Sequence, residues 1–188
     1  MASALWLIRH GETAWSLSGQ HTSSTDLPLT AEGERKAAGV GKMLAGKRFS
    51  AVYVSPMTRA KETCRIAGYG VGAIVTDDLR EWNYGSYEGL TSTEIQKTAP
   101  GWTIWTGTPP GGETVEQVAD RARRVIQSAP AGDVAIFGHG HMLRILTACW
   151  LQIAPEMGRC FALSTGSISV LGHERETPVI LMWNQTNL

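Results

Sequence analysis

The chain has 188 residues, 43% of them hydrophobic, and its 17 basic and 17 acidic side chains cancel. This length and apolar content predict a single domain over residues 1–188. A neutral chain excludes the broad basic surface of nucleic-acid-binding proteins, so any anion must be held by a local cluster of cations.

Short apolar runs alternate along the chain with segments of helical pattern. Continuous apolar runs predict buried strands at Ala4–Ile8, Ala51–Ser55 and Asp133–Gly138, and Ser167–Gly172 and Val179–Trp183 are predicted as closing strands. Cap residues and helical patterns predict helices from Thr30 to about Leu44, after Pro56, from the capping box Thr91–Glu94, from Thr114 to about Ser128, and over His141–Leu151. This alternation predicts an α/β sandwich with a mainly parallel sheet.

Polar residues follow three of the predicted strands. The segments are Arg9-His10-Gly11, Ser55-Pro56-x-x-Arg59 and Gly138-His139-Gly140-His141. Because ligands in α/β folds bind beyond the carboxyl ends of the strands, we expect these residues to meet at one rim of the sheet. The first backbone amides of the helix after His139, including that of Gly140, add partial positive charge there.

Two arginines and two histidines at one rim predict a pocket for a dianionic phosphoryl group. Neighbouring cations should lower the pKa of His10, which keeps the imidazole uncharged and a nitrogen lone pair available. A backbone carbonyl bonded to the other ring nitrogen would fix the tautomer. His10 is then a candidate nucleophile that carries the phosphoryl group, while Arg9, Arg59 and His139 stabilise its charge.

The leaving alcohol needs a proton, and the segment Leu79–Gly89 supplies two candidate carboxyl groups. We favour Glu81 as the residue that protonates the leaving group and then accepts a proton from water. Glu88, next to Gly89, is predicted to anchor a turn.

The same side chains admit a competing interpretation as a zinc site. His10, His139, His141 and Glu81 are all possible zinc ligands. Two arginines directed at the same place would repel a divalent cation, so we predict that the site uses no metal and no other cofactor.

At this point the sequence resembles the histidine phosphatase superfamily, also called phosphoglycerate mutase-like. The matching segments, in the family's order, are Arg9–Thr13, Leu27–Gly33, Ser55–Arg59, Glu81–Gly89, Gly112–Thr114 and Gly138–Gly140. The resemblance implies a three-layer α/β/α fold, phosphorylation of His10, a phosphate pocket of Arg9, Arg59 and His139, and proton transfer by Glu81. It also implies independence from metals.

The segments around residues 15–22 and 81–91 look closest to a branch of the family that contains sugar-phosphate phosphatases and bacterial acid phosphatases. Many members of the family have Asn where this chain has Ser16, whose hydroxyl still offers one hydrogen bond to phosphate but reaches less far. By this similarity the candidate substrate contacts are Ser16, His21, Thr22, Tyr84, Gly140 and Arg144. The alternative for the outer residues is an ordinary surface or packing role.

Three functions fit these residues to different degrees. A phosphatase acting on a small phosphorylated metabolite, best described as a sugar phosphate, is the favoured one. A phosphoglycerate mutase would use the same phosphohistidine, but the short segment between Glu81 and His139 leaves little room for the lid that excludes water in mutases. A non-catalytic phosphate-binding module would be expected to have lost some of the catalytic residues, and none is missing.

The remaining features bear on location and partners. The three cysteines are odd in number and lack metal-ligand spacing, which favours free thiols in a reducing compartment. The apolar start is too short for a signal peptide, and no run approaches the roughly 20 residues that span a bilayer. We therefore expect a cytoplasmic protein with no membrane or nucleic-acid partner, and a homodimer remains open. Trp102 and Trp105 lie in a Pro- and Gly-rich segment, either as a cover over the site or as simple packing.

Overall fold

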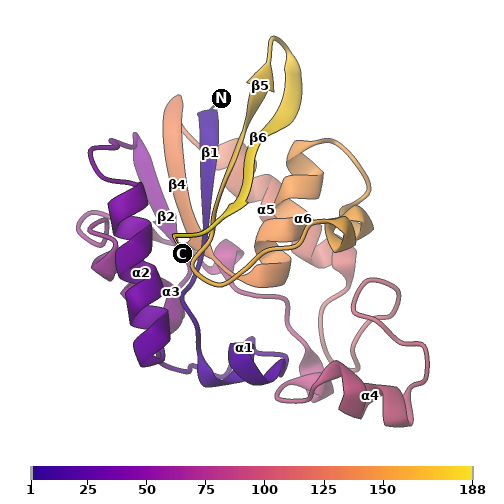
Figure 1. Cartoon of the computed structure of the whole chain (residues 1–188). Coiled ribbons are helices and arrows are strands. Elements are labelled where there is room, and N and C mark those ends of the chain that lie inside the picture. Colours follow the sequence, from indigo (N-terminus) through magenta and orange to yellow (C-terminus); the bar gives the residue numbers. More distant parts are fainter. Residues whose placement is uncertain (1, 188) are drawn as a thin grey trace.

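The computed structural model describes residues 2–187 and contains a six-stranded sheet in the order β3-β2-β4-β1-β5-β6 (Figure 1). The strands are β1 (Ala2–Arg9), β2 (Ala51–Val54), β3 (Ile74–Val75), β4 (Gly132–Gly138), β5 (Ile168–Glu174) and β6 (Thr177–Gln185). The pairs β1–β4, β4–β2 and β2–β3 are parallel, whereas the closing hairpin β5–β6 adds to β1 in antiparallel orientation. The predicted mainly parallel sheet is confirmed.

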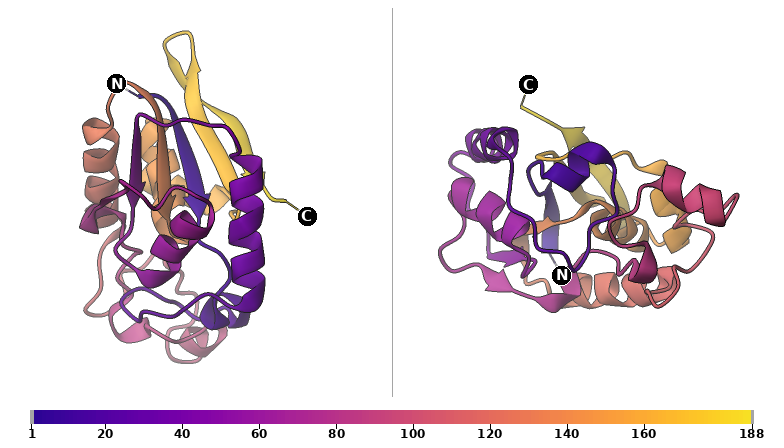
Figure 2. Two further views of the ribbon diagram at one scale, coloured as in Figure 1. Left: turned by 90° about the vertical axis from the view of Figure 1, so that its left-hand side faces the viewer. Right: turned by 90° about the horizontal axis from the view of Figure 1, so that it is seen from below.

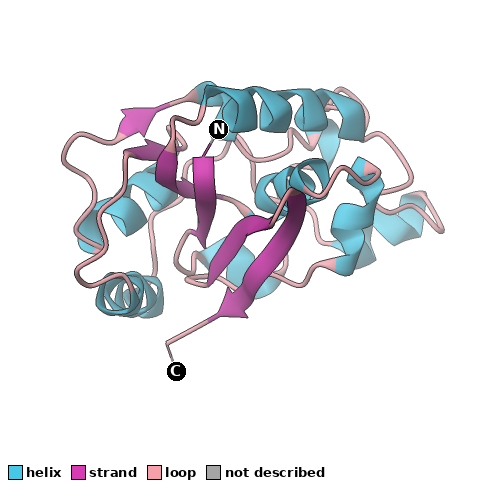
Figure 3. Cartoon of the chain, turned by 90° about the horizontal axis from the view of Figure 1, so that it is seen from above, coloured by secondary structure: helices cyan, strands magenta, loops and turns pink. Residues whose placement is uncertain are grey.

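Alternate residues of the central strands pack on opposite faces of the sheet. Leu5 and Leu7 of β1 belong to a core shared with α5 (Val115–Ser128) and α6 (Gly140–Trp150). Ile8 belongs to a second core, shared with α2 (Ala31–Met43) and α3 (Thr58–Ile66). Helices therefore cover both faces of the sheet, which is why these strands are continuously apolar (Figures 2 and 3). The three-layer architecture is confirmed.

Threonine caps begin several of the predicted helices. Thr30 accepts a hydrogen bond from Gly33 at the start of α2. Thr91 and Thr114 form the predicted capping boxes with Glu94 and Gln117, at the starts of α4 (Ser92–Thr98) and α5. Such caps satisfy amides that have no partner inside the helix, which is why they locate helix starts well.

The boundaries differ from the prediction in several places. Strand β2 ends at Val54, so Ser55 lies outside it, α6 begins at Gly140, and the closing strands run beyond the predicted ends because a tight turn near Arg175 joins them into one hairpin. The chain also forms elements that the pattern did not predict: α1 (Ala14–Ser18), β3 and three short 3₁₀ helices, Asp77–Leu79, Gly85–Tyr87 and Pro155–Cys160. These elements are too short to show a clear periodicity.

The carboxyl ends of β1, β2 and β4 lie at one rim of the sheet, and α1 and α4 lie beyond that rim (Figure 1). Gly11 lets the chain turn sharply after β1, because a Cβ there would lie 2.3 Å from the carbonyl oxygen of Gly33. The Gly11 amide donates to Thr63 Oγ1 of α3 at 2.9 Å. The loop after β1 is thus locked between α2 and α3. Among residues 2–187, no helix is long and apolar enough to cross a membrane.

Candidate active site

His10 lies at the end of β1 and is 5% exposed. Its Nδ1 is 2.6 Å from the carbonyl oxygen of Gly11. A carbonyl only accepts, so Nδ1 carries the hydrogen and Nε2 is left with its lone pair. Burial, together with the positive charges of Arg9 and Arg59, holds the pKa of His10 well below its ordinary value. The ring is therefore an uncharged base with one free nitrogen.

Arg9 precedes His10, and its guanidinium borders the same cleft. One Nη1–H group donates to the carbonyl of Leu163. Among the described residues, Arg9 Nε is the one buried side-chain polar atom without a hydrogen-bond partner. Gly140 packs beside this group, since a Cβ there would lie in van der Waals contact with Arg9 Cζ, at 3.4 Å. A buried donor with no protein partner beside an open cleft is suited to an anion.

Arg59 reaches the site from α3 and is completely buried. Its terminal nitrogens donate to the backbone carbonyls of Thr22, Ser23 and Thr25, at 3.1 to 3.4 Å. The amides of Ser23 and Thr25 bond in turn to the Glu88 carboxylate. The loop of residues 22–25 is therefore held by the Arg59 guanidinium at its carbonyls and by the Glu88 carboxylate at its amides. The prediction that Glu88 anchors a turn is confirmed.

His139 is also completely buried, and its ring centroid is 5.1 Å from that of His10. Arg59 Nε donates to His139 Nδ1 at 3.2 Å, so the hydrogen is on Nε2, which donates to Ser55 Oγ at 2.7 Å. Burial and the charge of Arg59 lower the pKa of His139 well below its ordinary value. Sequence reasoning placed Arg59 and His139 on the pocket surface, whereas both lie buried beside His10 with most of their polar atoms bonded to protein.

Glu81 precedes Trp82 in the loop between the 3₁₀ helices Asp77–Leu79 and Gly85–Tyr87 and is 6% exposed. Its Oε1 accepts from the amides of Trp82 and Met142, at 2.9 and 2.8 Å, and its Oε2 accepts from the amide of His141 at 3.0 Å. Two of these donors belong to the first turn of α6, whose dipole favours a negative group. The carboxyl group is thereby fixed at the same rim as His10.

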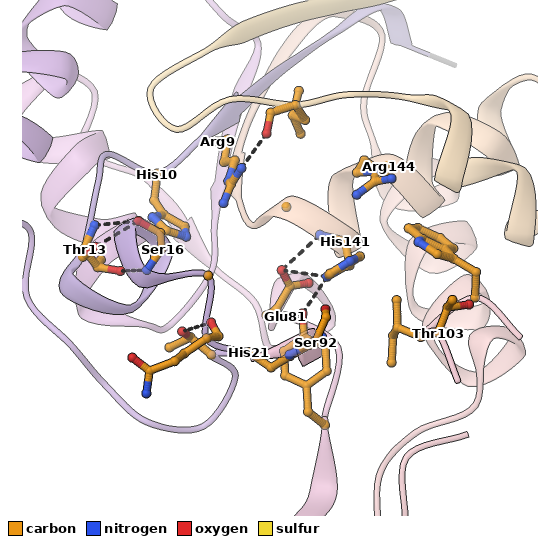
Figure 4. Close-up of a pocket in the computed structure, with 18 of the residues that line it drawn as sticks. Arg9, His10, Thr13, Ser16, His21, Glu81, Ser92, Thr103, His141 and Arg144 are labelled. Atoms are coloured by element: carbon orange, nitrogen blue, oxygen red, sulfur yellow. Dashed lines mark hydrogen bonds and ion pairs between the residues drawn. The ribbon is translucent and has the colours of Figure 1, made fainter. Parts of the chain in front are cut away.

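A cleft of about 350 Å³ opens over these groups (Figure 4). His10 and Arg9 lie on one side of it, and Glu81 and His141 lie on the other. The sequence-predicted residues that line it are Arg9, His10, Ser16, His21, Thr22, Glu81, Tyr84, Gly140 and Arg144. Trp102 and Trp105 line it as well, so the segment that carries them does reach the site.

Two of the predicted hydroxyl contacts are engaged in local structure. Ser16 Oγ donates to the carbonyl of Thr13 and accepts from its amide, because Ser16 completes the capping box of α1. Thr22 Oγ1 donates to the carbonyl of Gln20. Each hydroxyl has a single hydrogen, so the geometry gives these side chains a structural role and leaves them only lone pairs for a ligand.

The outer wall of the cleft consists of rings and one cation. Tyr84 is 2% exposed, and its hydroxyl lies 2.6 Å from Nδ1 of His141. Arg144 donates to the carbonyls of Gly158 and Arg159 and stacks 4.7 Å from the ring centroid of Trp105. Burial of His141, together with the charge of Arg144, lowers the pKa of that ring well below its ordinary value, which disfavours an ion pair between His141 and Glu81 at their 4.0 Å approach.

Sequence reasoning missed Arg121, which lies behind the Glu81 loop. It donates to the carbonyls of Asp78, Arg80 and Glu81 and pairs with both carboxylate oxygens of Glu113. Trp82 donates its indole N–H to the carbonyl of Glu113 as well. The motif around Gly112-Glu113-Thr114 was the available signal, but nothing in it identified the arginine partner.

The hydrogen bonds of the candidate zinc ligands also bear on whether these residues could bind a metal ion. Within residues 2–187, no group of three His, Cys, Asp or Glu side chains could hold a metal ion. Both ring nitrogens of His139 are engaged by Arg59 and Ser55, and Nδ1 of His10 is engaged by Gly11. The residues that sequence reasoning considered as zinc ligands therefore do not form such a cluster.

Comparison with known proteins places the chain in a family. A model of the histidine phosphatase superfamily (branch 1) matches residues 5–186. An acid phosphatase of Mycobacterium tuberculosis is 41% identical over 176 residues, 90% of this chain and 86% of that protein. The sedoheptulose 1,7-bisphosphatase of Saccharomyces cerevisiae is 34% identical over 185 residues, 80% of this chain and 68% of that protein. The solved structure of a Mycobacterium tuberculosis open reading frame has a TM-score of 0.93 at 37% identity and covers 100% of both chains. The resemblance expected from the motifs is confirmed: the chain belongs to the histidine phosphatase superfamily and is a phosphatase.

Proposed function

We propose that this phosphatase hydrolyses a small phosphorylated metabolite, a sugar phosphate, through a phosphohistidine at His10 and without a metal ion. The observation that carries the proposal is the Nδ1 hydrogen bond of His10 to the Gly11 carbonyl, which leaves Nε2 as a free nucleophile in the cleft. The unpartnered Nε of Arg9 supports binding of the phosphoryl oxygens beside it.

The reaction has two steps. In the first, the Nε2 lone pair of His10 attacks phosphorus, the P–O ester bond breaks, and the carboxyl form of Glu81 protonates the leaving alkoxide. In the second, water attacks the phosphorus of the phosphohistidine, Glu81 accepts a proton from that water, and the N–P bond breaks to release phosphate. Arg9 and Arg59 supply positive charge for the phosphoryl oxygens throughout.

The substrate class is supported less directly than the reaction. A cleft of about 350 Å³ suits a small molecule. One relative is named for a sugar bisphosphate, which favours a sugar phosphate over a protein substrate. The aromatic rings on the outer wall offer apolar faces against which the carbon skeleton of a sugar can pack.

The test combines two variants with two esters. We expect His10→Ala to lower kcat/KM by about 10⁴-fold or more on both glycerol 3-phosphate and p-nitrophenyl phosphate. We expect Glu81→Gln to lower kcat by about 10² to 10⁴-fold on glycerol 3-phosphate, and far less on p-nitrophenyl phosphate, whose phenolate leaves without a proton. Rapid quenching should trap acid-labile, alkali-stable phosphate on the wild-type chain and none on His10→Ala.

Two outcomes would overturn the proposal. Loss of activity in EDTA with recovery on added zinc would contradict the metal-free mechanism. Interconversion of 3-phosphoglycerate and 2-phosphoglycerate faster than phosphate release would assign the phosphohistidine to a mutase instead.

A further inference from the structure

Two histidine rings lie parallel to each other at the outer part of the cleft. His21 and His141 both line it, their ring planes are parallel within 2°, and their centroids are 6.4 Å apart. His21 lies between α1 and the 22–25 loop, whereas His141 is in the first turn of α6. They come from distant parts of the chain, so their parallel arrangement depends on the fold and not on local sequence.

The hydrogen bond of His21 fixes which of its nitrogens meets the cleft. Its Nδ1 lies 2.8 Å from the carbonyl oxygen of Leu90, and a carbonyl only accepts. In the uncharged ring, Nδ1 therefore carries the hydrogen and Nε2 keeps its lone pair. That nitrogen has no protein partner among the described residues and is not sealed from solvent, so His21 presents a hydrogen-bond acceptor.

His141 has the opposite arrangement. The Tyr84 hydroxyl is buried, and among the described residues its one partner is Nδ1 of His141, at 2.6 Å. A buried phenol whose hydrogen is left without an acceptor is costly, so Tyr84 donates and Nδ1 accepts. Burial raises the pKa of Tyr84 well above its ordinary value, which keeps the phenol protonated. The ring hydrogen of His141 is then on Nε2, which presents a hydrogen-bond donor.

The cleft thus offers a hydrogen-bond acceptor on His21 and a hydrogen-bond donor on His141. A hydroxyl group is the simplest substituent that donates and accepts at once, and a chain of hydroxyls can satisfy both rings. Trp105, whose centroid is 5.3 Å from that of His141, and Trp102, 6.1 Å from His21, add apolar surface for the carbon atoms between hydroxyls.

We propose that His21 and His141 recognise hydroxyl groups of the leaving alcohol, so that the substrates are phosphate esters of polyhydroxy compounds and not of simple alkyl alcohols. The proposal rests on the proposed function and deepens it. Tyr84 has a positioning role in it, because its hydroxyl sets the tautomer of His141.

Asparagine variants test each ring without disturbing its anchor. The Asn amide lies near the position of Nδ1, so His21→Asn keeps a donor for the Leu90 carbonyl, and His141→Asn keeps an acceptor for Tyr84. Both remove only the group that faces the cleft. His173→Asn, on the exposed hairpin of β5 and β6, is the matched control. Phosphate release from glycerol 3-phosphate, ribose 5-phosphate and 1-propyl phosphate is measured at pH 8, where an ordinary imidazole is uncharged.

We expect each cleft variant to lower kcat/KM about threefold to tenfold on the two hydroxylated esters, the size of one net hydrogen bond, and less than twofold on propyl phosphate. The control should match the wild type on all three. Equal losses on all esters, or no loss on any, would overturn the proposal. A wild-type chain that cleaves none of these esters, nor p-nitrophenyl phosphate, would instead contradict the phosphatase mechanism.

Tyr84→Phe distinguishes a positioning role from a merely structural one, because only a positioning role predicts a loss that depends on the ester. Without the phenol, the hydrogen of His141 is free to occupy either nitrogen, so we expect the same ester-selective loss as in His141→Asn. In the double variant the two losses should not add, because both act through the same Nε2–H group. Additive losses would show that Tyr84 acts independently of His141.

Discussion

The inner and outer parts of the cleft are built in different ways. At the inner end the ionisable side chains are fixed by the backbone: Gly11 holds His10, the first turn of α6 holds Glu81, and loop carbonyls hold Arg59. At the outer end, rings and a single guanidinium bond to one another and to loop carbonyls. The inner end is therefore fixed mainly by backbone groups, and the outer end mainly by contacts among side chains from loops and from α6.

This difference separates chemistry from selectivity. Groups fixed by backbone cannot shift without disturbing the sheet or a helix start, which suits the atoms that react. Side chains at the outer end can be exchanged at less cost to the fold, which suits the atoms that distinguish one alcohol from another. We therefore expect inner substitutions to affect both stability and turnover, and outer substitutions to affect mainly the choice of substrate.

Apart from loss of the nucleophile or of the proton donor, the largest expected effect is that of Arg59→Met. It removes the buried charge beside His10 and leaves the carbonyls of Thr22, Ser23 and Thr25 without their donor. We expect kcat/KM to fall by about 10³-fold or more and the free energy of unfolding to fall by about 3 kcal/mol. Steady-state kinetics measures the change in kcat/KM, and urea unfolding measures the change in the free energy of unfolding.

Arg59→Lys is the matched control, because it keeps the charge but lacks the planar set of donors. We expect it to recover part of the activity while remaining destabilised. A lysine variant with wild-type kinetics and stability would show that the loop does not depend on the guanidinium, and the proposed link between loop and chemistry would be wrong.

A pH-dependent effect on stability comes next. Burial and nearby arginines lower the pKa of His10, His139 and His141 in the folded chain, whereas an unfolded imidazole titrates near about 6.5. Below that pH the unfolded chain binds protons that the folded chain does not. Each histidine therefore contributes stability that is complete above about pH 6.5 and is lost as the pH falls toward its folded pKa, at up to about 1.4 kcal/mol per pH unit.

Urea unfolding between pH 5 and pH 8 measures this slope. His10→Asn at the inner end and His141→Asn at the outer end should each reduce it by up to one proton. Both variants keep the hydrogen bond at the position of Nδ1, so the comparison reports on titration. Slopes identical to that of the wild type would mean that these rings titrate alike in both states, contrary to their burial.

The inner end was also the part most accessible to prediction from sequence. His10 and His139 directly follow strands, whereas Arg9 ends β1 and Arg59 lies in the helix after β2. The carboxyl ends of parallel strands meet at one rim, which brings these residues together. The position of a residue after a strand does not determine how deeply it is buried, which is why Arg59 and His139 lie beside His10 and not on the surface of the cleft. The carbonyl that fixes the tautomer of His10 belongs to Gly11, whose role as a hydrogen-bond partner no residue type encodes.

The outer end depends on pairings between segments that are far apart in the sequence. His21 meets His141 of α6, and Tyr84, which is 57 positions before His141, reaches the same ring. Arg121 supports the Glu81 loop from α5 through backbone carbonyls, which leave no pattern in the sequence. Sequence reasoning considered His141 only as a zinc ligand, because its role depends on a tautomer that is set by a partner on another segment.

The smallest expected effect is that of Arg144→Met. Arg144 stacks on Trp105 and donates to the carbonyls of Gly158 and Arg159, so it holds one wall of the outer cleft. We expect KM for glycerol 3-phosphate to rise about threefold to tenfold, with kcat changed less than twofold, because the reacting groups at the inner end stay in place.

Arg144→Lys separates the two roles of this arginine. If the charge binds the substrate directly, lysine should restore KM, and if the guanidinium acts by holding Trp105 and the carbonyls, lysine should behave like methionine. The two hydrogen bonds of Arg144 and its stacking contact with Trp105 favour the second result. A fall in kcat comparable to that in Arg59→Met would show that the outer wall takes part in the chemistry, and the division between the two ends of the cleft would not hold.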